Sequence, residues 1–559
     1  MPKRPREEVQ DDLPPAKRTR GKNGSSGRLS TLSNELLLHI LSFLPMRSLN
    51  VCQRISRRFY SLGADSELWK RQYYTQWVRP RARRLANARR SSLPVKAEYT
   101  PKVSTWLDHS HLADKGKVTN WKRQYRLRHN WAIGSCRVTE AEIPHPSSPP
   151  VIIKLFSGFV FTADTVNGLR VWAAKDPTCC LAKTPLSDTS ESRSRPSALA
   201  VGQHQNEQEI LIGFENGRFT CFFFDINTCQ LRRHESHVGF RDGAITAMAL
   251  SPPYLLMVSQ HKLLSLYDLG GSSHPSSGTS EAKGLRELAS LRADSMIAPV
   301  TLSIRVSAMD IVASIAYSFF HIGCGWALGI QELRFDKNGQ QLDSRLVSTV
   351  DSQYGIRPFQ DLPPSNQPRH SAGVETLHGP DPIAPAAPSI LHRQPPTSMS
   401  YSHPYLLTSH ADNTLTMYLV VSTSDSLFVR GGQRLWGHTS SVSGVQVTNR
   451  GKAVSVSARG DEVRVWELET AVPSLNSRRA LKEQSSVQIS PEKYAREDPR
   501  SGYVLQEPQR GRSGIVVPSA GTSADLPRIY ECVGFDEERV ILLREKGAGT
   551  QLLECYDFT

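Results

Sequence analysis

The chain has 559 residues and a formal net charge of +15, and apolar residues make up 38% of it. At roughly 150 residues per domain, this length predicts three or four domains unless repeats build one large domain. Residues 1–130 hold 28 Lys and Arg against 10 Asp and Glu, whereas residues 131–559 hold 40 against 43. The near-neutral larger part argues against a nucleic-acid-binding domain there, because such a domain would carry its own basic face.

Cysteine usage indicates the redox compartment, and the apolar runs indicate whether the chain crosses a membrane. The nine cysteines include no CxxC pair, which predicts free thiols in a reducing compartment. The start MPKRPREEVQ has no apolar segment of the kind found in secretory signals. The long uncharged run at 311–331 contains serines, a histidine and glycines, so we predict two buried strands around Gly323 to Gly325 instead of a membrane span. We expect a soluble intracellular protein of the nucleus or cytoplasm.

Residues 1–28 are polar and charged, and we predict a disordered basic tail. Two short basic clusters in it, separated by about a dozen residues, resemble a bipartite nuclear import signal. A solvated tail without such a role is the equally weighted alternative. The residues of the candidate signal are Lys3, Arg4, Lys17, Arg18 and Arg20.

A helical unit is predicted over 29–74. Ser33 or Asn34 can cap its first helix, and Glu35 lies in the first turn, where the helix dipole favours an anion. Apolar side chains from 36 to 44 cover more than one stripe of that helix, and Pro45 ends it. A unit of fewer than about 50 residues cannot bury so much apolar surface by itself. Some leucines must therefore face another chain or domain, whereas Ile55 and Phe59 are assigned to the unit's own core.

A helical basic linker is predicted over 75–130. Its arginine-rich run at 79–90 is consistent with a phosphate-contacting helix or with a solvated linker. The solvated linker is favoured because no aromatic side chain is interleaved for stacking on bases. The chain turns helical again between Trp106 and Trp131, with one helix over 121–134.

From residue 131 onward the pattern changes to short strands separated by tight turns. Seven such units recur, at 159–172, 209–225, 254–269, 300–335, 405–418, 452–468 and 538–558. Polar, Pro- or Ser-rich insertions, which we expect to be disordered, interrupt them at 177–197, 270–284, 352–400 and 470–527. Without the insertions each unit has about 41 residues, close to the 40–45 of a four-stranded propeller blade. An all-β propeller of seven blades is therefore predicted over 131–559.

The segment 437–468 resembles a WD repeat, because Gly437-His438 opens it and Trp466-Glu467 closes it. The resemblance implies a buried hydrogen-bonded chain of His, Ser or Thr, Asp and Trp within the blade. The corresponding residues are His438, Ser457, Asp461 and Trp466, with Asp412 in the preceding unit. The other units match this pattern less closely.

Residues 29–74 resemble an F-box, a small helical unit that starts with Leu-Pro-x-Glu-Leu-Leu and ends with Leu-Trp. The matching residues are Leu32, Glu35, Leu36, Leu37, Ile40, Leu41, Leu44, Leu49, Ile55-Ser56-Arg57, Phe59 and Leu68-Trp69. The chain departs from the pattern at Ser33, where Pro is usual, and at Arg47. The segment from Trp121 to Gly134 is similar to the helix that joins the F-box to the propeller in F-box/WD proteins.

Together these resemblances imply a substrate receptor of an SCF (Skp, cullin, F-box) ubiquitin ligase. The F-box would bind the Skp adaptor and through it cullin, and the propeller would hold a target protein. Receptors of this type often capture phosphorylated segments with arginine clusters, and the candidate arginines here are Arg218, Arg334 and Arg459. The implied adaptor-binding residues are Leu32, Glu35, Leu36, Ile40, Leu41, Leu44, Pro45 and Leu49. The alternative is a nuclear WD-repeat scaffold, or a nucleic-acid-associated protein that acts through its basic N-terminal third.

No catalytic site is predicted, because the sequence contains no glycine-rich phosphate loop, HExxH or GxSxG motif. Cys324 is assigned to the core, and His438 to blade packing. His403 and His410 lack a second pair of ligands at metal-binding spacing. No cofactor and no metal are expected.

Overall fold

The computed structural model describes residues 29, 32–80, 119–144, 151–186, 194–205, 207–240, 243–270, 285–307, 310–350, 390–423, 425–460, 462–468, 486–491, 533–545 and 550–559. The described residues form two compact units, one made of those up to residue 80 together with 119–125, and one made of those from residue 126 to residue 559. Helix α7 (Trp121–Ile133) contributes its first five residues to the smaller unit and the others to the larger one.

The smaller unit is helical, as predicted. Its elements are α1 (Asn34–Leu41), α2 (Met46–Cys52), α3 (Arg57–Gly63), α4 (Ser66–Tyr73) and the π-helical turn η2 (Tyr74–Val78). The Ser33 hydroxyl accepts a hydrogen bond of 3.4 Å from the Leu36 backbone N–H and so caps α1. Pro45 precedes α2, where its missing N–H leaves no hydrogen bond unmade. The core consists of Leu37, Leu41, Leu49, Leu62 and Leu68.

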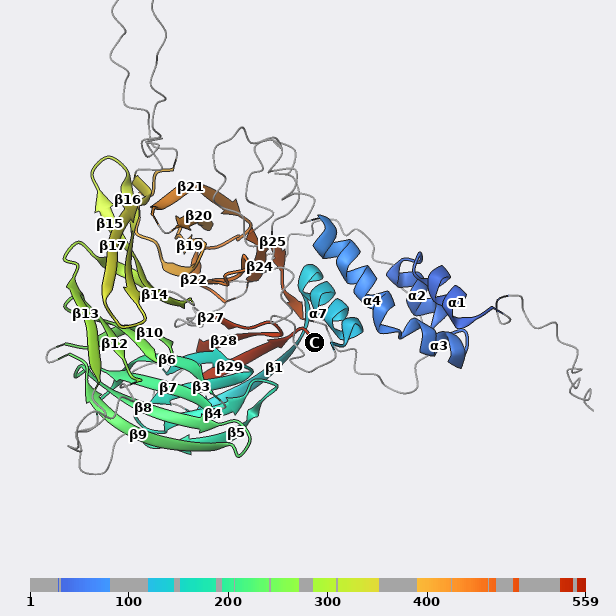
Figure 1. The fold of residues 1–559 in the computed structure, drawn as a ribbon, viewed down its shortest axis with the longest axis horizontal. Helices are drawn as coiled ribbons and strands as arrows, with labels where there is room; N and C mark the ends of the chain where they lie inside the picture. The colour runs from blue at the N-terminus through green and yellow to red at the C-terminus, as the bar shows by residue number, and fades with distance from the viewer. Residues whose placement is uncertain are drawn as a thin grey trace, which may run out of the picture. The chain divides into compact units, whose positions relative to one another are not determined.

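The described strands of the larger unit form seven sheets arranged as blades around a ring (Figure 1). Blade 1 consists of β2 (Ile152–Phe156), β3 (Phe159–Asp164), β4 (Gly168–Ala173) and β5 (Asp176–Thr184). Blade 2 consists of β6 (Pro196–His204), β7 (Glu207–Phe214), β8 (Arg218–Asp225) and β9 (Gln230–Val238). Blade 3 consists of β10 (Ile245–Ser251), β11 (Tyr254–Ser259), β12 (Leu263–Asp268) and β13 (Arg286–Arg292).

The remaining blades follow in chain order, except that the last one also uses the first strand. Blade 4 consists of β14 (Ile297–Val306), β15 (Asp310–His321), β16 (Gly325–Asp336) and β17 (Gln341–Ser348). Blade 5 consists of β18 (Ser398–Ser402), β19 (Tyr405–Ser409), β20 (Thr414–Ser422) and β21 (Leu427–Trp436). Blade 6 consists of β22 (Val442–Val447), β23 (Lys452–Ser457), β24 (Val463–Glu467) and β25 (Ser486–Gln488). Blade 7 consists of β27 (Val533–Phe535), β28 (Arg539–Glu545), β29 (Thr550–Asp557), β1 (Ser135–Pro144) and β26 (Ser490–Pro491). The predicted seven-bladed propeller is confirmed.

The ring is closed by strands from both ends of the larger unit. In blade 7, β1 pairs antiparallel with β29, with Arg137 opposite Asp557 and Pro144 opposite Thr550. On its other side, β1 pairs in parallel with β26, which directly follows blade 6. Closure of this kind joins the first and last strands by backbone hydrogen bonds and leaves no gap between blades 6, 7 and 1.

The strand order gives the propeller two distinct ends. In blades 1 to 6 the strands pair in chain order, and all of these pairs are antiparallel. The turns between first and second strands and between third and fourth strands therefore lie at one end, and the turns between second and third strands lie at the other. The α7–β1 junction and the C-terminal residue Thr559 belong to the first end, because β1 begins and β29 finishes there. We call it the entry end and the other the far end.

The longest hairpin of the propeller is formed by β15 and β16, at twelve residues each. It covers the run at 311–331, so the predicted pair of strands is confirmed; the strands are buried except near the turn, where Phe320 and Ile322 are exposed. Its residues near the middle, such as Ile315 and Ile330, are fully buried between neighbouring blades. Among the described helices, none is long and apolar enough to span a bilayer.

Three of the four predicted insertions contain strands, so their boundaries were partly wrong. β5 occupies 176–184, β18 begins at Ser398, and β25 and β26 lie at 486–491. In β5 polar side chains are exposed on an outer strand, and such a strand shows little apolar alternation in its sequence. Residues 187–193, 271–284, 351–389, 469–485 and 492–532, like the tail 1–28 and most of the linker at 81–118, lie outside the described residues.

Candidate functional site

Helix α1 presents apolar side chains on two sides. Leu37 and Leu41 are buried in the core of the helical unit, at 1% and 2% exposure. Leu36 and Ile40 of α1, and Phe43 in the turn that follows it, come at spacings of four and three residues and are 54%, 43% and 66% exposed. A helix that only covers a core shows polar residues on its outer side. The outward stripe of Leu36, Ile40 and Phe43, here called the α1 stripe, is therefore a candidate binding surface.

Further exposed apolar side chains lie on the next two helices and their connection. Val51, Ile55 and Tyr60 are 63%, 64% and 61% exposed. The assignment of Ile55 to the core was wrong, because Ile55 lies in the turn after α2 and only Phe59 packs against the core. Phe43, Val51 and Tyr60 were missed by the sequence analysis. For Phe43 the spacing from Leu36 and Ile40 was the available signal.

The structure divides the predicted adaptor-binding residues into two groups. Leu41 and Leu49 are buried in the unit's own core, and Leu32 and Leu44 pack against it. These four residues shape the unit and leave little surface for a partner. The exposed members are Glu35, Leu36, Ile40 and Pro45.

Polar contacts fix the beginning of α1. The Arg58 guanidinium donates to the Asn34 side-chain oxygen at 3.0 Å and to the Leu32 carbonyl at 2.5 Å. At Glu35, hydrogen bonds from its own backbone N–H and from the Ser33 hydroxyl lower the carboxyl pKa. This end of the helix therefore keeps an ionised carboxylate beside the α1 stripe.

Aromatic side chains build the other part of the helical unit. Trp121 of α7 packs on Tyr73 and Tyr74 with centroid distances of 5.5 and 5.7 Å. Tyr125 meets Trp69 and Trp77 at 5.3 and 4.8 Å. The start of α7 is thus an integral part of the helical unit.

The later residues of α7 belong to the propeller unit and contact its entry end. Trp131 stacks on Phe558 at 3.8 Å, and its indole N–H donates to the Glu537 carbonyl at 2.9 Å. The Lys452 ammonium lies 4.2 Å from the centroid of the Trp131 ring, and burial lowers the pKa of this lysine to about 8. Arg128 forms an ion pair of 2.9 Å with Glu467. These contacts cover part of the entry end with helix.

Blade 6 contains a buried polar chain of the kind implied by the WD resemblance, but with different members. The Ser455 hydroxyl lies 2.6 Å from the His438 Nε2 atom and accepts from the Trp466 indole N–H at 2.7 Å. The His438 Nδ1 atom lies 3.3 Å from a Glu462 carboxylate oxygen. Ser455, not the predicted Ser457, therefore joins His438 to Trp466. Ser457 instead accepts from the Glu462 backbone N–H at 3.1 Å.

The predicted Asp461 lies outside the described residues, and the carboxylate in contact with His438 comes from Glu462. Burial raises the pKa of Glu462, but hydrogen bonds from Thr439 and Arg464 outweigh it and keep the pKa below its usual value. Asp412, the predicted residue of blade 5, accepts from the hydroxyl of Thr414 at 2.6 Å and so organises the β19–β20 turn.

Blade 1 repeats part of this arrangement, which supplies the sequence signal that was missed. The Trp172 indole donates to the Thr162 hydroxyl at 2.9 Å, as Trp466 does to Ser455. The hydroxyl precedes the tryptophan by ten residues in blade 1 and by eleven in blade 6. A Ser or Thr ten or eleven residues before a tryptophan therefore predicts this hydrogen-bonded chain better than an aspartate does.

The three arginines considered for phosphate binding do not come together. Arg334 lies towards the entry end of blade 4, where its guanidinium donates to Asp310 at 2.9 Å and to the Thr423 carbonyl at 2.8 Å. Arg218 and Arg459 adjoin far-end turns of blades 2 and 6. Phosphate capture needs several cationic donors at one point, and this trio cannot provide them.

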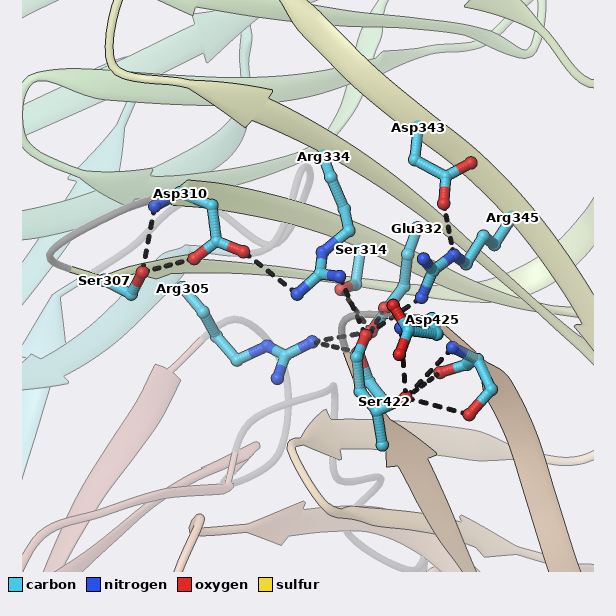
Figure 2. A network of polar contacts seen from close by, with 12 residues as sticks. Arg305, Ser307, Asp310, Ser314, Glu332, Arg334, Asp343, Arg345, Ser422 and Asp425 are labelled. Carbon is cyan, nitrogen blue, oxygen red and sulfur yellow. Dashed lines mark hydrogen bonds and ion pairs between the residues drawn. The ribbon is translucent and has the colours of Figure 1, made fainter. Parts of the chain in front are cut away.

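Figure 2 shows the polar network that holds Arg334, between blades 4 and 5. The fully buried Glu332 accepts from Arg305 at 2.6 Å and from the Ser422 hydroxyl at 2.6 Å. Arg345 pairs with Asp343 and also donates to the Thr423 carbonyl at 2.9 Å. Each arginine is thus bonded to an acidic side chain, and we interpret the network as a connection between blades.

Three side chains that were considered for chemistry, Cys324, His403 and His410, are buried or half-buried, as is one further histidine, His392. Cys324 is fully buried. His410 stacks on His392 at 3.9 Å, and burial lowers the pKa of His410 to about 3. Burial also lowers the pKa of His403 to about 3. Within the described ranges, no group of three or more His, Cys, Asp or Glu is placed to hold a metal ion.

Comparison with known proteins agrees with the division into a helical unit and a propeller. An F-box-like family matches residues 31–75, and a family described as the F-box protein pof12 beta-propeller matches residues 136–559. The chain is similar to F-box protein pof12 of Schizosaccharomyces pombe, with 22% identity over 456 residues that cover 78% of this chain and 84% of that protein. An F-box joined to a propeller is an architecture typical of non-catalytic receptor proteins.

Solved propellers are also similar, at lower identity. The structure of U3-55K shares 10% identity at a TM-score of 0.38, over 74% of this chain and 99% of that one. The Swd1 propeller of Myceliophteria thermophila shares 11% at 0.36, over 74% of this chain and 98% of that one. Because the family match spans the whole propeller and an F-box-like unit precedes it, the chain belongs to the pof12 family of F-box proteins with a β-propeller.

Proposed function

We propose that this chain is a substrate receptor of an SCF ubiquitin ligase. The F-box binds the Skp adaptor, and through it cullin, and the propeller binds a target protein that the ligase marks for degradation. The chain contributes proximity and no catalytic group, since binding both partners raises the local concentration of the target near the transfer machinery.

The observation that supports the proposal is the second apolar side of α1. The α1 stripe exposes two large side chains on α1 and a third in the turn that follows it, while the opposite side of the helix already fills a core. Isolated exposed apolar residues are ordinary, but a contiguous row on one helix marks a protein interface. Each such side chain stabilises an interface by about 1–3 kcal/mol when it is covered.

The test is binding of purified full-length protein to recombinant Skp adaptor, measured by titration calorimetry. We expect Leu36→Ser/Ile40→Ser to weaken binding at least about 100-fold, because two apolar anchors are lost. The matched control is Val166→Ser, which alters a 66% exposed apolar residue in a propeller turn and should leave adaptor binding unchanged. Leu41→Ala is unsuitable, since Leu41 is buried and its loss would destabilise the unit.

Adaptor binding that survives in Leu36→Ser/Ile40→Ser would contradict the proposed surface. A folded wild-type protein that does not bind the adaptor at all would contradict the receptor function itself. Circular dichroism of each variant checks that the helical unit remains folded.

A further inference from the structure

The tip of the β15–β16 hairpin extends beyond its own blade. The last residue of β15 paired with β14 is Ser318, and the first residue of β16 paired with β17 is Gly329. Residues 319–328 therefore form a two-stranded tip with no strand of blade 4 on either side. The tip lies at the far end of the propeller, away from the end that α7 contacts. A target protein can reach it without competing with α7 for space.

The tip carries apolar side chains on its surface. Ile322, at the turn, is 97% exposed, and Phe320 is 59% exposed. Phe320 lies opposite Trp326, and the two rings meet edge to face with centroids 6.0 Å apart. The sequence from 319 to 328, FFHIGCGWAL, contains no Lys, Arg, Asp or Glu. An uncharged aromatic projection of this kind is unusual on the surface of a soluble protein.

The tip is held in place, so its apolar side chains are presented on a fixed backbone. The His321 Nδ1 atom accepts from the backbone N–H groups of Gly323 and Cys324, both at 3.2 Å. The backbone N–H of Trp326 donates to the His392 carbonyl at 2.9 Å, and Gly325 forms an isolated β-bridge with His392. A preorganised surface loses little conformational entropy when a partner binds.

The apolar surface continues from the tip towards blade 5. Leu391 is 43% exposed and adjoins Gly325, where an added Cβ would lie 3.4 Å from the leucine side chain. The Arg434 guanidinium donates to the Leu391 carbonyl at 3.2 Å. Trp436, two residues further along β21, is 67% exposed. We call Phe320, Ile322, Trp326, Leu391 and Trp436 the far-end patch.

The charged side chains next to the patch indicate the charge of its partner. Arg434 is 30% exposed and pairs with Asp412 at the long distance of 3.8 Å. Arg393, two residues after Leu391, is exposed as well. Two cations against one carboxylate leave a positive surplus at the border of an uncharged apolar surface.

Resting on the proposed receptor function, we propose that the far-end patch binds a segment of the target protein that has bulky apolar residues next to an acidic one. Phe320, Ile322 and Trp436 cover the apolar residues, and Arg393 and Arg434 attract the carboxylate. Aromatic side chains held on a rigid backbone are typical energetic centres of protein interfaces. The substrate class is thus defined by an apolar-acidic sequence.

The test uses a displayed library of random twelve-residue peptides, selected on purified full-length protein. We expect the selected peptides to share two or more large apolar residues and at least one Asp or Glu. Their affinity should fall at least about tenfold for Phe320→Ser/Ile322→Ser, because two anchors are lost. It should fall several-fold for Arg393→Glu, and the latter loss should diminish at high salt.

The control is Leu346→Ser, which changes a 66% exposed leucine on the outer strand of the same blade and should leave peptide affinity unchanged. Peptides that bind the double variant as well as wild type would overturn the proposal, as would selection of basic or purely polar sequences. Sedimentation analysis tests whether the patch instead binds a second copy of this chain. Wild-type protein that dimerises while Phe320→Ser/Ile322→Ser stays monomeric would overturn it too, since the patch would then bind a second copy.

Failure of this proposal is distinguishable from failure of the receptor function. Adaptor binding depends on the α1 stripe and is measured without any peptide. A protein that binds the adaptor but selects no patch-dependent peptide would remove only the far-end patch from the description.

Discussion

The helical unit and the propeller place their apolar and polar side chains in opposite ways. On the helical unit, six large apolar side chains in the α1 stripe and at Val51, Ile55 and Tyr60 lie on the surface. The propeller places ionisable groups between and within its blades, with Glu332, His438 and Glu462 each less than a tenth exposed. The small unit exposes the kind of surface that a partner can cover, whereas the buried carboxylates Glu332 and Glu462 of the propeller accept internal hydrogen bonds.

This difference predicts where substitutions act. A change between the blades should reduce the stability of the propeller, because buried polar groups lose their partners. A change on the outer side of α1 should reduce binding and leave stability unaltered. At the far-end patch the propeller resembles the helical unit, since Phe320, Ile322 and Trp436 are exposed and the tip is uncharged.

The largest effect is expected for Glu332→Ala. This change removes the fully buried carboxylate that binds Arg305 and Ser422 between blades 4 and 5. We expect the free energy of unfolding to fall by about 3–5 kcal/mol, the usual cost of removing one partner of a buried ion pair. Urea denaturation measures it. Asp294→Ala is the control, because its pair with Arg292 is solvent-exposed and should contribute at most about 1 kcal/mol.

A smaller loss is expected for Ser455→Ala in blade 6. The Ser455 hydroxyl is the acceptor for Trp466 and the partner of His438, so its removal leaves two buried groups unsatisfied. We expect a loss of about 2–3 kcal/mol. Ser457→Ala removes the hydroxyl that accepts from the Glu462 backbone N–H and should cost about 1 kcal/mol. Equal losses for the two variants would show that Ser455 is not the centre of the chain.

The architecture followed from the sequence because repeats and helix signals are local. Seven strand-turn-strand units and the Leu36–Trp69 pattern were sufficient for the propeller and the F-box-like unit. The sequence did not predict which side of α1 is buried, since only packing distinguishes the apolar residues of that helix. These are Leu36, Leu37, Ile40 and Leu41. Ser455 and Ser457 both face inward from one strand, and the cross-strand register decides which of them Trp466 reaches. The far-end patch depends on where β14 and β17 stop, which no local pattern encodes.

Stability should also depend on pH through the histidine pair of blade 5. Burial lowers the pKa of His392 to about 4 and that of His410 to about 3. In the unfolded chain their pKa values return to about 6.5, so between pH 6.5 and 4 the unfolded state binds protons that the native state does not. The free energy of unfolding should therefore fall as pH falls, by about 1.4 kcal/mol per pH unit for each histidine. Denaturation between pH 7.5 and 4.5 measures the slope, and His410→Gln should reduce it. An unchanged slope in that variant would assign the effect to other groups.

The smallest effect on stability is expected for Ile40→Ser, and it separates the two units most clearly. Ile40 is 43% exposed, whereas its neighbour Leu41 is 2% exposed. Surface substitutions usually change stability by less than about 0.5 kcal/mol, whereas a buried Leu→Ala change costs about 2–5 kcal/mol. Thermal denaturation of Ile40→Ser should thus match wild type while Leu41→Ala unfolds at a lower temperature. If both variants were equally destabilised, the α1 stripe would be part of a core, and its role as a binding surface would have to be abandoned. If Ile40→Ser is stable yet binds the adaptor more weakly, its apolar surface serves a partner and not the fold.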